Sequence, residues 1–235
     1  MKVPYSWLKE LVNMDLTPSE LADKLVSVGF EIEEIIYQRD SIKNVIACKV
    51  TAEVKHPNSD HLNICQVTDG KNNYQIVTGA QNVNVGDIVP VALDGAVLPD
   101  GKTIKSGELR GVKSEGMMCS GGELCLTEDD YVGAGVYGIL ILKPDVAIGT
   151  DINDVIGNND IILDVAITAN RPDCNSILGI AREVAAICNV KVNMPNLTYK
   201  VSEGNVNDYV KVENKDFELC PRYMAAAVYD VVQTI

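Results

Sequence analysis

Short apolar runs separated by turn-forming residues dominate the stretch from Val45 to Ser120. Runs of strand length and strand composition begin at Val45, His61, Tyr74 and Asp87. The segments between them (HPNSD, DGKNN, NVNVG and LPDG) are typical of tight turns. Because about five short strands in an open sheet would leave exposed edges, the pattern predicts a small closed β-barrel.

Helical spacing characterises the residues before this stretch. Residues 4–12 place Trp7 and three aliphatic side chains on one helical face, so we expect a helix with Trp7 anchored in the core. A second helix follows Thr17, which forms a T-x-x-E capping box with Glu20. Gly29 is suited to the end of that helix.

Strands and one further helix are expected on both sides of the barrel segment. Residues 30–37 alternate in polarity as a strand does, and a final apolar strand is expected at the end of residues 122–142. Residues 161–168 form another predicted strand. Asp173 is then placed to cap a helix whose end falls at Asn189.

The last of these helices is apolar on a broad face, so it needs other helices to pack against. We therefore expect residues 1–39 and 151–200 to form one discontinuous domain, with the barrel of residues 40–150 inserted between its parts. Residues 219–235 are largely apolar and prone to form a strand, and we expect residues 205–235 to begin a third, truncated domain. The predicted fold class is α+β multidomain.

The charge of the chain limits how it could bind nucleic acid. The net charge is −13, whereas a simple nucleic-acid-binding domain has a basic face. The densest basic run lies within the barrel segment and consists of Lys102, Lys105, Arg110 and Lys113. The sequence therefore predicts a local basic strip on an acidic body, with weak and salt-sensitive RNA contact and no DNA partner.

Cysteine usage and hydropathy indicate a cytoplasmic protein without a membrane partner. The seven cysteines are odd in number and lie in apolar runs, which favours reduced thiols over a disulfide framework. No apolar stretch approaches the roughly 20 residues of a membrane span. The first residues also lack the basic and apolar regions of a signal peptide.

No catalytic set and no cofactor site is expected in these residues. A glycine-rich phosphate loop is absent, and the two histidines, His56 and His61, flank one turn without the ligand spacing of a zinc site. The acidic loop at residues 128–130 is expected to be solvated rather than metal-binding. Cys174 beside a helix start could have a lowered thiol pKa, but packing or capping is the favoured interpretation.

The barrel segment carries four blocks in order: HPNSDHLNICQVTDG, QIVTGAQNV, VPVALDGAVLPDG and ELRGVKSEGMMCS. Together they resemble the OB-fold tRNA-binding domain found in several synthetases and accessory proteins. The expected RNA-binding residues lie on the barrel rim, in the basic run and in the S-x-G-M block: Lys55, Asn58, Ser59, Lys102, Lys105, Arg110, Lys113, Ser114 and Met117. A purely structural role is the alternative for each of them.

Tyr74 is the one aromatic residue in the predicted strands of the barrel segment between Val45 and Ser120. Because bases bind single-strand readers by stacking on aromatic rings, we expect shape-dependent contact with a folded RNA rather than sequence-specific reading.

The flanking segments extend the resemblance over essentially the whole chain. MKVPYSWLKELV, FEIEEI, NRPDCNSILGIAREVA and ENKDFELCPRYMA are similar to the β subunit of bacterial phenylalanyl-tRNA synthetase. The resemblance implies an α2β2 assembly that attaches phenylalanine to its tRNA with ATP and magnesium, with the aminoacylation site on the α subunit. It also implies that residues 205–235 enter the domain that hydrolyses mischarged tyrosyl-tRNA, and that this fragment alone is inactive.

Two main hypotheses follow. The first is a non-catalytic N-terminal part of that β subunit, which serves tRNA docking and subunit architecture. The second is a standalone OB-fold tRNA-binding accessory protein. The block NRPDCNSILGIAREVA and the unfinished apolar end favour the first. A weaker third possibility is a barrel that only spaces subunits and touches no RNA.

Overall fold

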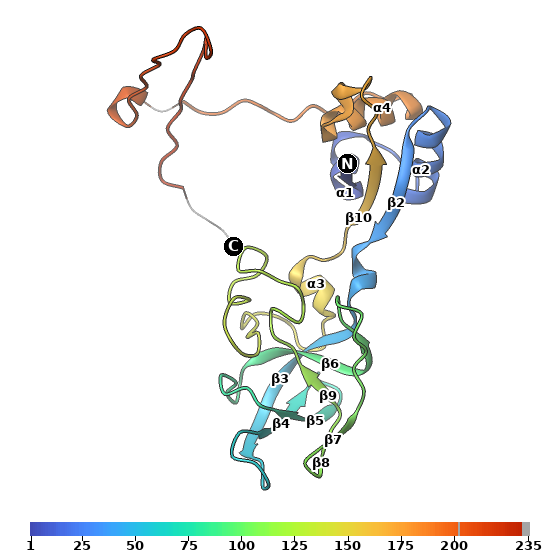
Figure 1. Cartoon of the computed structure of the whole chain (residues 1–235), viewed down its shortest axis with the longest axis vertical. Helices are drawn as coiled ribbons and strands as arrows, with labels where there is room; N and C mark the ends of the chain where they lie inside the picture. Colours follow the sequence, from blue (N-terminus) through green and yellow to red (C-terminus); the bar gives the residue numbers. More distant parts are fainter. Residues whose placement is uncertain (202, 232–235) are drawn as a thin grey trace. The chain divides into compact units, whose positions relative to one another are not determined.

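The computed structural model describes residues 1–201 and 203–231 (Figure 1). Contacts within the chain divide it into two units, Met1–Met194 and Pro195–Ile235, and each is described by itself.

Segments from both ends of the first unit share one sheet and one core (Figure 1). The sheet is antiparallel with the order β1-β10-β2. Its strands are β1 (Lys2–Pro4), β10 (Ile161–Ala166) and β2 (Glu31–Tyr37). Helices α1 (Tyr5–Leu11), α2 (Pro18–Ser27) and α4 (Ile177–Cys188) pack with it. Their common core includes Leu8, Leu21, Leu163 and Ile180, which are fully buried.

Helix-capping signals decide where these helices begin and end. The predicted capping box is confirmed: the Glu20 amide donates to Thr17 Oγ1 at 3.3 Å, and the Thr17 amide donates to Glu20 Oε2 at 2.8 Å. The expected cap at Asp173 is wrong, because the Ser176 hydroxyl accepts from the Gly179 amide at 3.0 Å and caps α4. The left-handed end at Asn189 is confirmed, with φ of 54°.

Trp7 corrects another expectation. It is 50% exposed, whereas Leu8 and Leu11 on the same helix, and Val12 directly after it, are buried. At 3.6 residues per turn, Leu8 and Leu11 lie on the arc that faces the sheet, and Trp7 lies at the border of that arc. Trp7 is therefore not the core anchor of α1.

The second sheet of this unit is curled and five-stranded, and all its pairs are antiparallel. Its order is β5-β4-β3-β6-β9. The strands are β3 (Lys43–Lys55), β4 (Asn63–Thr68), β5 (Asn73–Thr78), β6 (Ile88–Val97) and β9 (Gly116–Met118). A hairpin of β7 (Gly107–Leu109) and β8 (Val112–Ser114) stands beside it. The four strands that the apolar runs predict are confirmed.

Apolar clusters lie on both faces of this sheet. One includes Cys65, Val67 and Val89, and the other includes Ala47, Ala92 and Leu140. Burial on both faces explains why β6 begins with five consecutive buried residues instead of alternating.

The expected final strand within residues 122–142 is wrong. The Leu140 amide donates to Cys119 O, directly after β9, at 3.0 Å, and the Leu142 amide donates to Ile88 O in β6 at 2.8 Å, so the segment does not pair along one strand. It crosses the end of the curled sheet, and its apolar side chains cover the core there.

The two chain crossings between the sheets lie side by side. The 3₁₀ turn η1 (Gln38–Ser41) leads into β3, and α3 (Ile152–Ile156) leads out. Asn153 Nδ2 donates to Ile42 O at 3.0 Å, and Arg39 pairs with Asp154 at 2.6 Å. These contacts join the point where the chain enters the curled sheet to the point where it leaves.

The second unit has little regular structure in its described part. A short 3₁₀ turn, η3 (Val206–Asp208), and a stacked pair of rings, Tyr209 and Tyr229, are its main features. The strand expected near the end is absent over residues 219–231, and residues 232–235 lie outside the described residues. A strand is stable only when paired, and these residues have no pairing partner in the described part of this unit.

The Trp7 correction gives a stability test. Leu8→Ala should lower the free energy of unfolding by about 2–5 kcal/mol, because it leaves a cavity in the core. Trp7→Ala should cost less than about 2 kcal/mol, because half of that side chain is already in solvent. Denaturant unfolding of both variants measures the difference. A Trp7→Ala cost equal to that of Leu8→Ala would contradict the exposed position of Trp7.

Candidate nucleic-acid interface

The curled sheet is closed by a short segment, Lys113–Gly116, that bonds to the outer edge of β5. The Glu115 amide donates to Gln75 O at 2.8 Å, and the Gln75 amide donates to the Glu115 carboxylate at 2.9 Å. The Val77 amide donates to Ser114 Oγ at 3.0 Å. These bonds satisfy an edge that would otherwise be bare.

Gly116 is required by the close approach of strands β9 and β6. A Cβ atom at this position would lie 2.3 Å from the carbonyl oxygen of Ala92. The small residue of the S-x-G-M block therefore serves the packing of the sheet.

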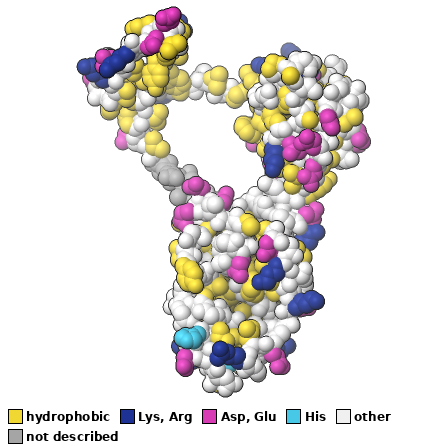
Figure 2. Space-filling model, viewed as in Figure 1, with side chains coloured by type: hydrophobic (Ala, Val, Ile, Leu, Met, Phe, Trp, Pro, Cys, Tyr) yellow, Lys and Arg dark blue, Asp and Glu magenta, His cyan; other side chains and the backbone are white. Residues whose placement is uncertain are grey.

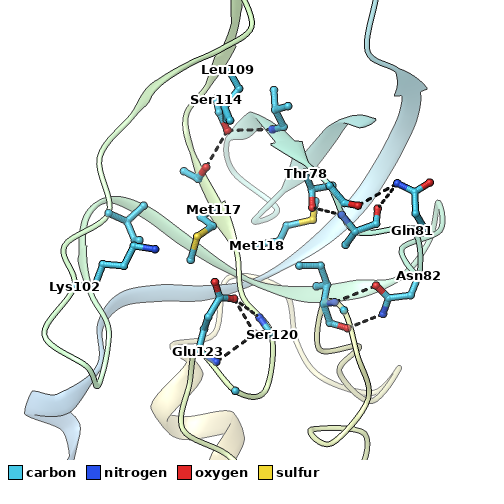
Figure 3. A pocket seen from close by; sticks show the side chains of 18 of the residues that line it. Thr78, Gln81, Asn82, Lys102, Leu109, Ser114, Met117, Met118, Ser120 and Glu123 are labelled. Atoms are coloured by element: carbon cyan, nitrogen blue, oxygen red, sulfur yellow. Dashed lines mark hydrogen bonds between the residues drawn. The ribbon is translucent and has the colours of Figure 1, made fainter. Parts of the chain in front are cut away.

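A pocket of about 1270 Å³ opens beside this closure. Its walls come from the end of β5 and the following loop, residues 102–109, the floor strand β9 and residues 134–139. Figure 3 shows Lys102, Met117 and Glu123 on one side and Thr78, Gln81 and Asn82 on the other.

The structure brings four of the predicted RNA-binding residues to this pocket. Lys102, Lys105, Ser114 and Met117 all line it. Both lysines are exposed, and neither forms an ion pair with any described residue. Ser114 is only 3% exposed, and its hydroxyl also donates to Gly116 O at 2.9 Å, so it contributes to the sheet closure.

A second group of predicted residues gathers around the buried ring of His56. Its Nδ1 accepts from the Asn58 amide at 3.0 Å, which leaves Nε2 to donate to Leu109 O at 3.1 Å. Arg110 donates to Asn58 O at 3.3 Å. Through these two hydrogen bonds, His56 connects its own turn to the tip of the β7–β8 hairpin. The same turn carries Asn58 and the half-buried Ser59.

This turn also borders the pocket. Lys55 Nζ donates to Gln81 Oε1 at 3.3 Å, and Gln81 is part of the pocket wall. The exposed cations Lys55 and Arg110 therefore extend the basic residues of the pocket along its rim. RNA contact by any of these residues stays a prediction.

Lys113 differs from the other cations because it has an ion-pair partner. Its Nζ lies 2.7 Å from Glu115 Oε1. This ammonium, together with the Gln75 amide, holds the pKa of Glu115 below its ordinary value of 4.5. Lys113 is consequently less available to a phosphate than Lys102 or Lys105.

Basic side chains of the first unit lie among acidic ones on the visible face in Figure 2. They do not form a continuous basic surface there. The arrangement agrees with weak, salt-sensitive contact rather than tight binding.

The side chains that could bind a metal ion already form hydrogen bonds or ion pairs within the chain. Both ring nitrogens of His56 form hydrogen bonds within the chain. The Glu128 carboxylate accepts from the amides of Gly133 and Gly135. Among the described residues, the one cluster with metal-ligand geometry is Asp173, Cys174 and Glu183. The guanidinium of Arg171 lies within it, 2.9 Å from Asp173 and 2.7 Å from Glu183, so both carboxylates already have an ion-pair partner.

Thiol chemistry is not favoured either. Burial raises the pKa of Cys174 to about 11, which is opposite to the lowered value weighed from its position near a helix start. Burial also raises the pKa of Cys48 to about 12. All seven cysteines are free, and Cys125 is the exposed one.

Two features of the site were missed by sequence analysis. Asn82 accepts from the Ile139 amide at 3.0 Å and donates to Ile139 O at 2.8 Å, which ties the loop after β5 to residues 134–139. Tyr137 in that segment is fully exposed and lines the pocket. The search for stacking residues in the sequence covered only the predicted barrel strands, and Tyr137 lies outside them.

The Glu115 contact predicts a pH dependence. A depressed pKa stabilises the fold above the unfolded-state value, and this contribution disappears as the pH falls through the folded-state value. Glu115→Gln keeps an acceptor for the Gln75 amide but cannot ionise. The melting temperature of the wild type should exceed that of the variant near pH 7, and the gap should narrow as the pH falls below 4.5 and through the lower folded-state value. A gap that is unchanged across this range would rule out the charge as its source.

Comparisons with known proteins agree with the geometry. Residues 45–151 match the family described as "Putative tRNA binding domain". The chain is 47% identical to "Phenylalanine--tRNA ligase beta subunit" of Clostridium tetani, with 98% of this chain and 29% of that protein aligned. The corresponding subunit of Syntrophus aciditrophicus is 40% identical, with 99% and 28% aligned. The chain therefore spans less than a third of the length of these relatives.

A solved MetRS related protein from Pyrococcus horikoshii overlaps 58% of this chain and 97% of its own, at 19% identity and a TM-score of 0.32, too low to establish a shared fold. None of the helices in the described ranges is both long enough and apolar enough to span a membrane. Residues 45–151 thus match the tRNA-binding family, and the chain as a whole is a relative of the phenylalanine–tRNA ligase beta subunits, as its sequence motifs indicated.

Proposed function

We propose that this chain is the tRNA-docking and architectural part of a phenylalanine–tRNA ligase β subunit. The observation that carries the proposal is the similarity to such subunits over 98% of the chain, with the tRNA-binding match falling on the residues that form the curled sheet and its pocket. The exposed cations of the pocket and rim support the docking role.

The proposed architecture is an OB-fold barrel, residues 40–150, inserted into a discontinuous α+β domain of residues 1–39 and 151–200. The sheet β1-β10-β2 supports this, because its strands come from both flanks. The paired chain crossings at Arg39 and Asp154 support it as well. We propose further that residues 205–235 begin the editing-type domain.

The proposed assembly is an α2β2 heterotetramer with the α subunit as partner, working in the cytoplasm. It would attach phenylalanine to tRNA, and ATP and magnesium would bind in the remainder of the assembly. This chain has no glycine-rich phosphate loop, so we expect it to be inactive alone.

The proposed RNA contact is electrostatic. Lys102, Lys105, Arg110 and Lys55 would meet phosphates, while Asn58 and Ser59 would offer hydrogen bonds from the rim. Each phosphate contact releases counterions, so affinity should fall steeply with salt. With a net charge of −13 on the chain, the contact should be auxiliary.

A binding experiment tests the docking role. Lys102→Ala, Lys105→Ala and Arg110→Ala together should weaken tRNA binding and lower the slope of log affinity against log salt by about one per lost contact. Lys113→Ala alone should have little effect because Lys113 is ion-paired. The binding is measured by fluorescence anisotropy at low and moderate salt.

A matched control removes the same charge elsewhere. Lys2, Lys24 and Lys191 are exposed and lie outside the tRNA-binding match, so their triple alanine variant should bind tRNA nearly as the wild type does. Equal losses in both triple variants would mean that only net charge matters. Absence of wild-type binding at low salt would leave the architectural role, and binding to tRNA without association with an α subunit would favour a standalone accessory protein.

A further inference from the structure

We propose that the pocket beside the sheet closure holds one unpaired nucleotide of a bound RNA, with its base stacked on Tyr137. This inference rests on the proposed tRNA-docking function and names the part of the RNA that the pocket recognises. It replaces the expectation that the barrel lacks any stacking platform.

Tyr137 is the first observation. Its side chain is fully exposed, at 101% of the reference area, although it lines the pocket. Exposing a whole aromatic ring forgoes the large stabilisation that its burial would give. Aromatic rings displayed in this way are the platforms on which proteins stack unpaired bases.

The segment that carries Tyr137 is held in place before any ligand arrives. The Glu128 carboxylate accepts from the amides of Gly133 and Gly135 at 2.8 and 3.0 Å. On the other side, Asn82 holds the amide and carbonyl of Ile139. Fixing the backbone on both sides of Tyr137 lowers the ordering cost of binding.

The polar groups of the pocket explain what kind of recognition is possible. The Asn82 side chain is hydrogen-bonded to the backbone of Ile139, and Thr78 Oγ1 accepts from the Ala80 amide. The Glu123 carboxylate accepts from the amide and the hydroxyl of Ser120. Because these groups are engaged within the chain, few remain to read the edge of a base. Stacking beside the apolar Met117 therefore gives binding that tolerates any base.

The charges of the wall suit the phosphate of the same nucleotide. Lys102 and Lys105 are exposed and lie in one wall segment, where they can meet a backbone phosphate. Glu108 on that wall opposes them. A volume of about 1270 Å³ exceeds what a single small ligand needs, so one nucleotide fits together with part of the adjoining backbone.

Paired RNA does not fit this chemistry, because a duplex hides the faces of its bases inside the stack. The pocket should therefore distinguish unpaired from fully paired RNA. The lysines, in contrast, should attract both through their phosphates.

The test uses an RNA hairpin with a single-stranded 3′ tail containing 2-aminopurine, and a blunt hairpin with the same number of phosphates. With the wild type, stacking should quench the 2-aminopurine fluorescence. Tyr137→Ala should abolish the quenching and weaken binding of the tailed hairpin roughly 5- to 150-fold, while binding of the blunt hairpin stays unchanged. Tyr137→Phe keeps a ring and should behave as the wild type.

Two controls separate this inference from the proposed function. Val132→Ala changes an exposed apolar residue of the same segment that does not line the pocket, and it should leave the quenching intact. Glu108→Gln should strengthen binding of both hairpins by removing the opposing charge. If the wild type binds tRNA but Tyr137→Ala retains full quenching and affinity, the nucleotide pocket is wrong and the docking function survives. If the wild type binds no RNA at low salt, both fail.

Discussion

The curled sheet depends on how its two edges are joined. Strands β5 and β9 lie at opposite ends of the strand order, and the segment Lys113–Gly116 connects them. Ser114 and Glu115 supply this connection with side-chain and backbone hydrogen bonds instead of a continuous strand ladder. A five-stranded sheet left open at this point would present unpaired amides to solvent and to other chains.

The pocket follows from this closure. Its floor is β9, which can approach β6 only because Gly116 has no side chain. The same turn of chain leads back to the β7–β8 hairpin, whose tip is held by His56. One closing segment therefore positions the floor of the pocket, its lysine-bearing wall and the basic rim, which is why residues distant in sequence meet around one opening.

Local features could be predicted from the sequence because local interactions produce them. The capping box of Thr17 and Glu20, the left-handed end at Asn189 and the four short apolar strands each depend on residues within a few positions. Lys102, Lys105 and Arg110 of the site could also be found, since they belong to the densest basic run of the sequence.

Features that depend on tertiary contacts could not be predicted in this way. The exposure of Trp7 depends on which arc of α1 faces the sheet. The segment ending at Leu142 is apolar because its side chains cover the core of the curled sheet, although the segment is not itself a strand of that sheet. Ser114 looked suited to RNA contact, yet the partner that buries it is Val77 in a distant strand. Tyr137 was missed because only the tertiary fold brings its segment to the pocket wall.

Amide hydrogen exchange at Val77 tests whether residues 113–116 close the curled sheet. In Ser114→Ala the Val77 amide loses its acceptor, and since such a bond contributes about 1 kcal/mol, its exchange should accelerate several-fold or more. The Val67 amide in the middle of the sheet should be unaffected, and Ser27→Ala, which removes an exposed hydroxyl elsewhere, should change neither. Unchanged protection of Val77 in Ser114→Ala would show that the sheet is closed without this segment and would contradict the account.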